Sequence, residues 1–318
     1  MKANKLVLFS VLLSLLLASP AFAALAKVGP IVPYDAAAHT GNGYPKYYMD
    51  TNGVAVDLPV PPFAAPGGVS PAMIFGPVEP ANPFSVDIGF GAEAFFFFIT
   101  PDRDTFDALF PNGAISTLNV LIGMEAGFAG LGATVNGQQA VFQRIRFNWA
   151  AVVDPGVYRY FHPYGEEILT VAPGDIGTGG LRYTIDTPIV PQDFTFALGT
   201  NPLAPGKIGP FLFQVNPPPQ ITVLVPPIPA PYNKPTDWLG DGATTATFTG
   251  SPLNPPFNKF RIEAYTDAAF SIPLNIFPVA IGGTPTVNFV ETDLAVISAH
   301  RYHFPNLAGL EMLLLLDE

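Results

Sequence analysis

The sequence predicts an all-β protein made of two β-sandwich-like units, Ig-like or jelly-roll-like, joined by a proline-rich connection. The 318-residue chain carries 37 prolines and 30 glycines, spread through most of its length. A proline inside a helix costs about 3 kcal/mol, so long helices are largely excluded. Short apolar or alternating runs lie between these residues, which is the pattern of strands and turns. Because 49% of the residues are hydrophobic, the chain has enough apolar surface to bury a core.

The first 23 residues have the three parts of a secretory signal peptide. Lys2 and Lys5 form a positive start, residues 6–17 are almost entirely apolar, and residues 21–23 read Ala-Phe-Ala. The apolar run is too short to cross a hydrocarbon layer of about 30 Å. We therefore expect cleavage after Ala23, export, and no transmembrane segment in the mature chain. The alternative is an N-terminal membrane anchor.

Charge and cysteine content exclude several classes of protein. The chain has 14 basic and 25 acidic residues, and loss of the signal peptide removes two lysines, which makes it more acidic still. Nucleic-acid binding depends on Lys and Arg that neutralise phosphates, so we expect no nucleic-acid partner. With no cysteine, the chain can form no disulfide, thiolate zinc site or covalent haem link. We expect no cofactor.

The clearest local element is a β-hairpin over residues 47–58. Asn52 and Gly53 suit the two positive-φ positions of a type I′ turn, and Val54, Val56 and Leu58 alternate with other residues after it.

Further strands are expected in two units. The first unit spans residues 28–215, with strands at 94–100, 117–126, 140–153, 157–162, 167–172, 193–198 and 209–215. Residues 216–235 are dense in proline and form either a stiff linker or an edge between packed sheets, with one short strand at 221–225. The second unit spans residues 236–300, with strands at 244–248, 259–265, 271–277 and 286–290. Residues 301–318 form an atypical tail.

His162, Glu166 and Glu167 are the best acid–base group in the sequence. Successive residues of a strand point to opposite faces, so Glu166 and Glu167 cannot both face one substrate. Glycosidase chemistry needs two carboxylates that face each other about 5–10 Å apart, and nothing singles out a second one. There is also no Gly-x-Ser-x-Gly motif and no glycine-rich phosphate loop. We therefore predict no catalytic residues.

No metal site is predicted either. His300 and His303 have a spacing that zinc sometimes uses, but no third ligand stands beside them, and we expect them in an irregular tail. The run that begins at Asp50 resembles a calcium loop, but its glycine is fourth rather than sixth, and the hairpin turn already explains that glycine.

Aromatic side chains are the candidate binding residues. An exposed ring beside a turn can stack on a sugar or anchor a partner protein, whereas a buried one fills the core. The phenylalanines at 95–98 are expected to fill the core. The tyrosines near turns either fill the core or serve in recognition, and the sequence does not decide between the two. They are Tyr44, Tyr47, Tyr48, Tyr158, Tyr160 and Tyr164.

Several segments together resemble a family of uncharacterised exported bacterial proteins. Residues 44–53 are similar to that family's Phe-Pro-x-Trp-Tyr-x-Asp-x-Asn-Gly opening, and later landmarks keep their order at 93–97, 141–146, 162–165, 208–212 and 238–263. Members often have a cysteine just after the hairpin, where this chain has Pro59. The resemblance implies export and β-architecture but no known activity.

The expected function is that of an exported, non-catalytic cell-surface or extracellular protein with a structural or binding role. Its partner would be a glycan or another surface protein. The alternatives are a secreted hydrolase acting on polysaccharide and a periplasmic or envelope accessory protein.

Overall fold

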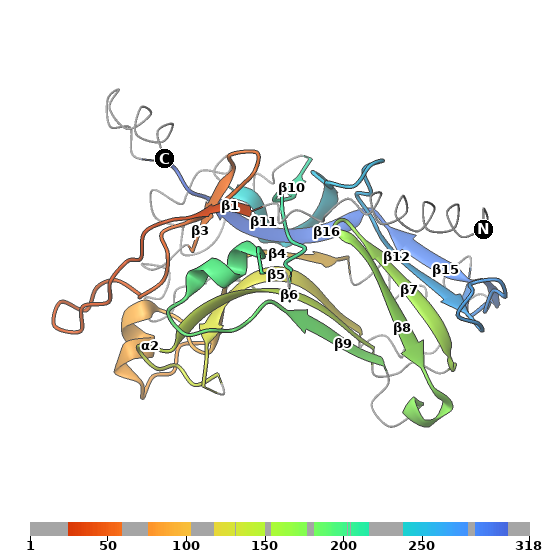
Figure 1. Ribbon diagram of the computed structural model, residues 1–318, viewed down its shortest axis with the longest axis horizontal. Coiled ribbons are helices and arrows are strands. Elements are labelled where there is room, and N and C mark those ends of the chain that lie inside the picture. Colours follow the sequence, from red (N-terminus) through yellow and green to blue (C-terminus); the bar gives the residue numbers. More distant parts are fainter. Residues whose placement is uncertain are drawn as a thin grey trace, which may run out of the picture.

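The computed structural model describes residues 25–58, 76–102, 118–130, 132–149, 154–176, 181–201, 203, 205–215, 238–278 and 284–304. Nearly all regular structure in this part of the chain is strand, as predicted (Figure 1). Residues 1–23, where a signal peptide is predicted, the proline-rich connection at 216–235 with its predicted strand at 221–225, and most of the tail at 301–318 lie outside the described residues.

The larger sheet is antiparallel and curled (Figure 1). Its strands follow the order β1 (Leu25–Val28), β2 (Tyr48–Asp50), β3 (Ala55–Asp57), β16 (Leu294–Arg301), β4 (Glu93–Pro101), β5 (Leu118–Phe128), β6 (Gln139–Trp149) and β9 (Leu181–Asp186). β11 (Trp238–Thr249) also pairs with β16, and β10 (Phe213–Gln214) pairs with β11.

The smaller sheet has four antiparallel strands. Their order is β15 (Phe289–Thr292), β12 (Phe260–Tyr265), β7 (Gly156–His162) and β8 (Gly165–Val171). β13 (Phe277–Pro278) and β14 (Pro285–Val287) form a separate ribbon. The described helices are short: α2 (Pro83–Ile88), η2 (Pro173–Asp175) and η3 (Phe194–Leu198).

The prediction of two separate units is not confirmed, because residues 28–215 and 236–300 contribute strands to both sheets. β16 pairs with β4 in the larger sheet, and β12 pairs with β7 in the smaller one. A single residue, Asp293, separates β15 from β16, so the chain passes directly from one sheet to the other. This sharing covers strand edges that would otherwise expose unpaired backbone groups.

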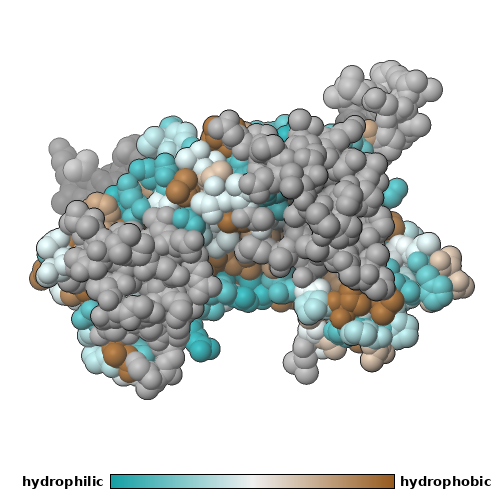
Figure 2. Space-filling view, turned by 180° about the vertical axis from the view of Figure 1, so that it is seen from behind, coloured by the Kyte–Doolittle hydropathy of each residue, from teal (hydrophilic) through white to brown (hydrophobic). Residues whose placement is uncertain are grey.

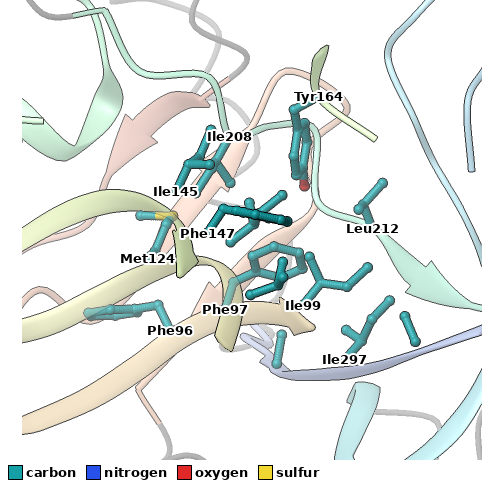
Figure 3. Packing of buried hydrophobic residues seen from close by; sticks show 14 of the residues in the cluster. Phe96, Phe97, Ile99, Met124, Ile145, Phe147, Tyr164, Ile208, Leu212 and Ile297 are labelled. Atoms are coloured by element: carbon teal, nitrogen blue, oxygen red, sulfur yellow. The ribbon is translucent and has the colours of Figure 1, made fainter. Parts of the chain in front are cut away.

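The two sheets pack against each other through aromatic rings. The ring centres of Phe147 in β6 and Tyr160 in β7 lie 4.7 Å apart, and those of Phe248 in β11 and Phe260 in β12 lie 5.7 Å apart. Figure 3 shows Phe147 in the buried cluster, together with residues from β4, β5, β16 and the segment around Leu212. Residues 95–98 are all buried, which confirms that both faces of this apolar strand are covered.

Several strand predictions are confirmed, one is wrong, and two are wrong in part. Residues 193–198 form η3 rather than a strand, because Asp193 caps the helix by accepting from the Thr195 N–H and Gly199 ends it at φ 75°. Residues 271–277 are mostly irregular, and their strand begins only at Phe277. Of residues 209–215, only Phe213 and Gln214 form a strand. β1, β9 and β16 were not predicted.

The hairpin over residues 47–58 is confirmed, but its turn is not type I′. Gly53 has φ 77°, whereas Asn52 is not among the described residues with positive φ. The Asp50 and Val54 backbones pair across the loop, and the Gly53 N–H donates to the Asp50 carbonyl. This is a three-residue loop with a left-handed glycine. The Asp50 carboxylate sets it, since Oδ1 accepts from the N–H groups of Asn52 and Val54.

Candidate functional site

The six tyrosines proposed for recognition all lie in the core. Their exposed fractions range from 0 to 7%. Most of the hydroxyls bind backbone carbonyls: that of Tyr44 donates to Gly127, that of Tyr48 to Phe194, and that of Tyr164 to Pro210, at 2.7–3.0 Å. A buried tyrosine needs such a partner for its hydroxyl. The structure therefore favours core filling for these rings, and it offers no surface for recognition through them.

The acid–base group is assembled around Glu167. The Glu167 side chain accepts hydrogen bonds from the Tyr183 hydroxyl at 2.5 Å, from His162 Nε2 at 3.5 Å and from Lys207 Nζ. Glu166 points to the other face of β8 and binds Arg159 instead. The predicted separation of the two carboxylates is confirmed. Tyr183 and Lys207 were missed because they lie far along the chain from Glu167, where no local pattern marks them.

The environment of this cluster suits a structural role. Burial alone would raise the pKa of Glu167, but the hydrogen bonds from His162, Lys207 and Tyr183 outweigh it and hold the pKa at about 2. His162 is fully buried, and burial lowers its pKa, so the ring is neutral. The Tyr164 N–H donates to Nδ1, which leaves the ring proton on Nε2, facing Glu167. At neutral pH the ionised Glu167 has no proton to give as a general acid, and the His162 ring has no contact with solvent.

The cluster ties together two edge strands. Glu167 belongs to β8 of the smaller sheet, and Tyr183 belongs to β9 at the edge of the larger sheet. Their contact bridges the side of the molecule opposite the β15–β16 crossing. We call the set of His162, Glu167, Tyr183 and Lys207 the edge latch.

A small depression is lined in part by Lys207, whose ammonium group binds Glu167. Its wall includes Gln143, Asp186 and Thr187. The Gln143 amide binds the backbone of Ala197 and Ile208. Thr187 Oγ1 accepts from the Gln143 N–H, and Asp186 binds Arg144. These side chains hold the loop before β10 in place rather than a substrate.

A second buried carboxylate, Glu125, lies on the opposite face of the larger sheet. Arg144 donates to Glu125 at 2.8 Å and forms two further 2.8 Å bonds with Asp186. Its guanidinium lies 4.8 Å from the centre of the Phe142 ring, so aromatic and basic residues share this face of β6. Burial raises the pKa of Glu125 to about 7, against the lowering influence of Arg144.

This raised pKa predicts a pH effect on stability. The pKa of Glu125 is 4.5 in the unfolded chain and about 7 in the folded chain, so between these pH values the folded chain binds more protons at this residue. Glu125 therefore stabilises the fold at low pH, and this stabilisation is lost as the pH rises toward 7. Glu125→Gln removes the effect. We expect the variant to gain about 2 kcal/mol relative to the wild type between pH 5 and pH 8, measured by urea unfolding. If the difference in unfolding free energy between the variant and the wild type is the same at pH 5 and at pH 8, this prediction is wrong.

The two histidines considered for zinc lie in different environments. His300 lies in β16 rather than in an irregular tail, it is buried, and its Nδ1 binds Asp57 at 2.6 Å. His303 is exposed. Among the described residues, no group of three or more His, Asp or Glu side chains is placed to hold a metal ion.

The outer face of the smaller sheet carries a continuous row of alternating charges. Glu166 binds Arg159 at 2.5 and 3.1 Å, Arg159 lies 3.6 Å from Glu263, and Glu263 binds Arg261 at 2.6 Å. The row continues from Arg261 to Glu291 at 3.6 Å and from Glu291 to Lys259 at 3.0 Å. We call these six residues the charge row. It crosses all four strands of the sheet, and its members are partly accessible to solvent, with side-chain exposures between 9 and 44%.

The two guanidinium groups of the charge row stack on phenylalanine rings. Arg159 lies 4.6 Å from the ring centres of both Phe161 and Phe270, and Arg261 lies 4.0 Å from that of Phe289. The three rings are half-buried. Stacking on a ring fixes the plane in which a guanidinium group presents its N–H donors.

On the side shown in Figure 2, brown patches reach the described surface at separate places among hydrophilic residues. Within the described residues, no helix combines the length and apolar character that a bilayer crossing needs. The charge row is therefore the candidate functional surface.

Comparison with known proteins adds no relative. No protein-family model matches the chain, and neither a curated protein nor a solved structure is significantly similar to it.

Proposed function

We propose that this chain is an exported, non-catalytic surface or extracellular protein that binds a neutral glycan on the outer face of the smaller sheet. The observation that carries the proposal is the charge row with its stacked rings. Residues 1–23 and the resemblance to exported bacterial proteins support export. We also propose that the two sheets form one sandwich-like body, which the shared strands support better than two Ig-like or jelly-roll-like units.

The charges on this face favour a neutral ligand. The row contains three basic and three acidic residues, so it presents no excess of either sign. The whole chain carries a net charge of −11, which repels anionic polysaccharides. Guanidinium and carboxylate groups can bind sugar hydroxyls, and a phenylalanine ring can pack against the apolar face of a pyranose.

A hydrolase is the less favoured function. Its best acid–base residues, His162 and Glu167, lie in the edge latch, where Glu167 stays ionised and His162 is shielded from solvent. A two-carboxylate glycosidase needs one carboxyl group with a raised pKa that faces a substrate cleft and acts as the general acid. Glu125 has the raised pKa, but it is buried beside Arg144.

The proposal is tested by calorimetric titration of the mature protein with soluble neutral hexasaccharides of the cello-, malto-, xylo- and manno- series. At least one should bind, and oligogalacturonate, which is anionic, should not. Arg159→Gln removes the central cation of the charge row, and we expect it to weaken binding at least about tenfold. Its stability should change by about 1 kcal/mol or less, because the ion pairs it breaks are partly exposed.

Lys46→Gln is the matched control, since Lys46 is an exposed cation before β2 in the other sheet. It should bind like the wild type. No binding to any member of the panel, or equal weakening by both substitutions, would reject the charge row as a glycan site. Release of reducing sugar that disappears in Glu167→Gln would instead establish the hydrolase.

A further inference from the structure

The turn that follows β12 holds a phenylalanine in a strained backbone conformation. Phe270 has φ 56° and is one of three described residues other than glycine with a positive φ. A bulky residue is rare in this left-handed region, because its Cβ crowds the following carbonyl. Such strain persists only where the surrounding structure imposes it, and it is a reason to ask what the residue does.

Asp267 closes this turn with its carboxylate. Oδ1 accepts from the Ile272 N–H at 2.8 Å and from the Ser271 N–H at 3.0 Å, and Oδ2 accepts from the Ser271 hydroxyl at 2.8 Å. The Phe270 N–H donates to the Asp267 carbonyl at 3.2 Å, and the Thr266 N–H donates to the Ile272 carbonyl at 3.0 Å. These bonds hold both ends of the turn, and they impose the backbone conformation of Phe270.

The strained residue places its ring against the charge row. The ring centre of Phe270 lies 4.6 Å from Cζ of Arg159 and 5.4 Å from the ring centre of Tyr265. The Tyr265 hydroxyl donates to Glu263, the carboxylate next to Arg159 in the charge row, at 2.7 Å. The turn therefore lies against the middle of the charge row, where its ring adds to the contact that Phe161 makes with Arg159.

We infer that Asp267 and Phe270 are positioning residues for the glycan site. Asp267 fixes the turn, the turn fixes the Phe270 ring, and the ring fixes the plane in which Arg159 presents its N–H donors. The part of this inference that concerns glycan binding rests on the proposed function. A donor that is already held in place loses less conformational entropy when a ligand binds, so a loosened turn weakens binding without removing a contact with the glycan.

The first test changes Phe270 and measures binding, by calorimetric titration, of the hexasaccharide that the wild type binds. Phe270→Leu keeps an apolar side chain but loses the ring, and we expect it to weaken binding about fivefold or more. Phe270→Tyr keeps the ring and should bind within about twofold of the wild type. Ile272→Ala is the control in the same turn, because the Ile272 side chain is 57% exposed, and it should bind like the wild type.

The second test asks whether Asp267 acts through Phe270. Asp267→Ala should weaken binding about fivefold, although its unfolding in urea should change little because the turn is exposed. The double variant Asp267→Ala/Phe270→Leu should bind within about twofold of Phe270→Leu alone, since the ring that Asp267 positions is already gone. Losses that add in full would overturn this route from Asp267 to the site.

The Nε–H signal of Arg159 in a proton–nitrogen NMR spectrum reports the position of the guanidinium group without any ligand. Its loss in Arg159→Gln assigns it, and the ring current of Phe270 shifts it. We expect Asp267→Ala and Phe270→Leu to move the signal in the same direction. Ile272→Ala should leave it nearly unchanged.

These measurements separate failure of the positioning from failure of the glycan site. Unchanged binding and an unchanged Arg159 signal in both Asp267→Ala and Phe270→Leu would overturn the inference while the glycan site stands. Equal weakening by Ile272→Ala and Phe270→Leu would also overturn it, because any change in the turn would then act alike. If no hexasaccharide binds the wild type but the signal moves as expected, the proposed function fails and the positioning of Arg159 stands.

Discussion

Replacing Asp50 with alanine is expected to lower the free energy of unfolding by about 3–5 kcal/mol, the largest effect of any substitution considered. The Asp50 carboxylate is 1% exposed. Oδ1 accepts from the N–H groups of the hairpin turn, and Oδ2 accepts from the N–H of Phe211, 161 residues away, at 2.9 Å. Alanine leaves three backbone donors without their acceptor in or near the core.

Asp267→Ala is the control for this prediction. Asp267 also accepts from backbone donors, those of Ser271 and Ile272, but the loop is exposed, so water can replace the carboxylate. We expect a loss of about 1 kcal/mol or less. Urea unfolding with an unchanged m-value measures both. If Asp50→Ala cost no more than Asp267→Ala, the carboxylate would not be the link between the hairpin and the segment around Phe211.

Glu167→Gln is expected to cost about 3 kcal/mol at pH 7, because it neutralises the centre of the edge latch. The folded pKa of about 2 lies below the unfolded value of 4.5, so the stabilisation is fully present above about pH 4.5 and is lost as pH falls toward 2. The difference between wild type and variant should therefore shrink in acid. This dependence is opposite in sign to that of Glu125.

Glu166→Gln is the matched control, since it makes the same change one residue away on the outer face. Its partner Arg159 is partly exposed, so the expected loss is about 1 kcal/mol or less at every pH. A double-mutant cycle with Lys207→Met measures the coupling inside the edge latch. Equal losses for the two glutamines, or a Glu167→Gln effect that does not change with pH, would contradict the latch.

Composition and local pattern were sufficient for the all-β character and for several strands. The strands predicted at 140–153, 157–162 and 167–172 were correctly placed within the described residues, because their signals come from neighbours in sequence. β16 was missed because its buried residues include Ala295, Ser298 and His300, which do not form a strongly apolar run. Its partners β3, β4 and β11 are distant in sequence, and so the shared sheets could not be foreseen.

Local sequence patterns likewise predicted one part of the candidate site and not the rest. Opposite orientations of Glu166 and Glu167 follow from the period of a strand, and they were predicted. The tyrosines near turns were not resolved, because a ring beside a turn can point either way, and the packing of two sheets decides which. The charge row requires the pairing of β12 with both β7 and β15, which the sequence does not specify.

Glycan binding by the variants Glu166→Gln and Glu167→Gln is the most direct test of the account. It shows whether the outer face of the smaller sheet binds the glycan while the edge latch only supports the fold. Both are titrated with the hexasaccharide that the wild type binds, at a temperature where circular dichroism shows both folded. We expect Glu166→Gln to weaken binding about fivefold or more and Glu167→Gln to change it by about twofold or less. The reverse order would contradict this division and place the functional surface at the edge latch.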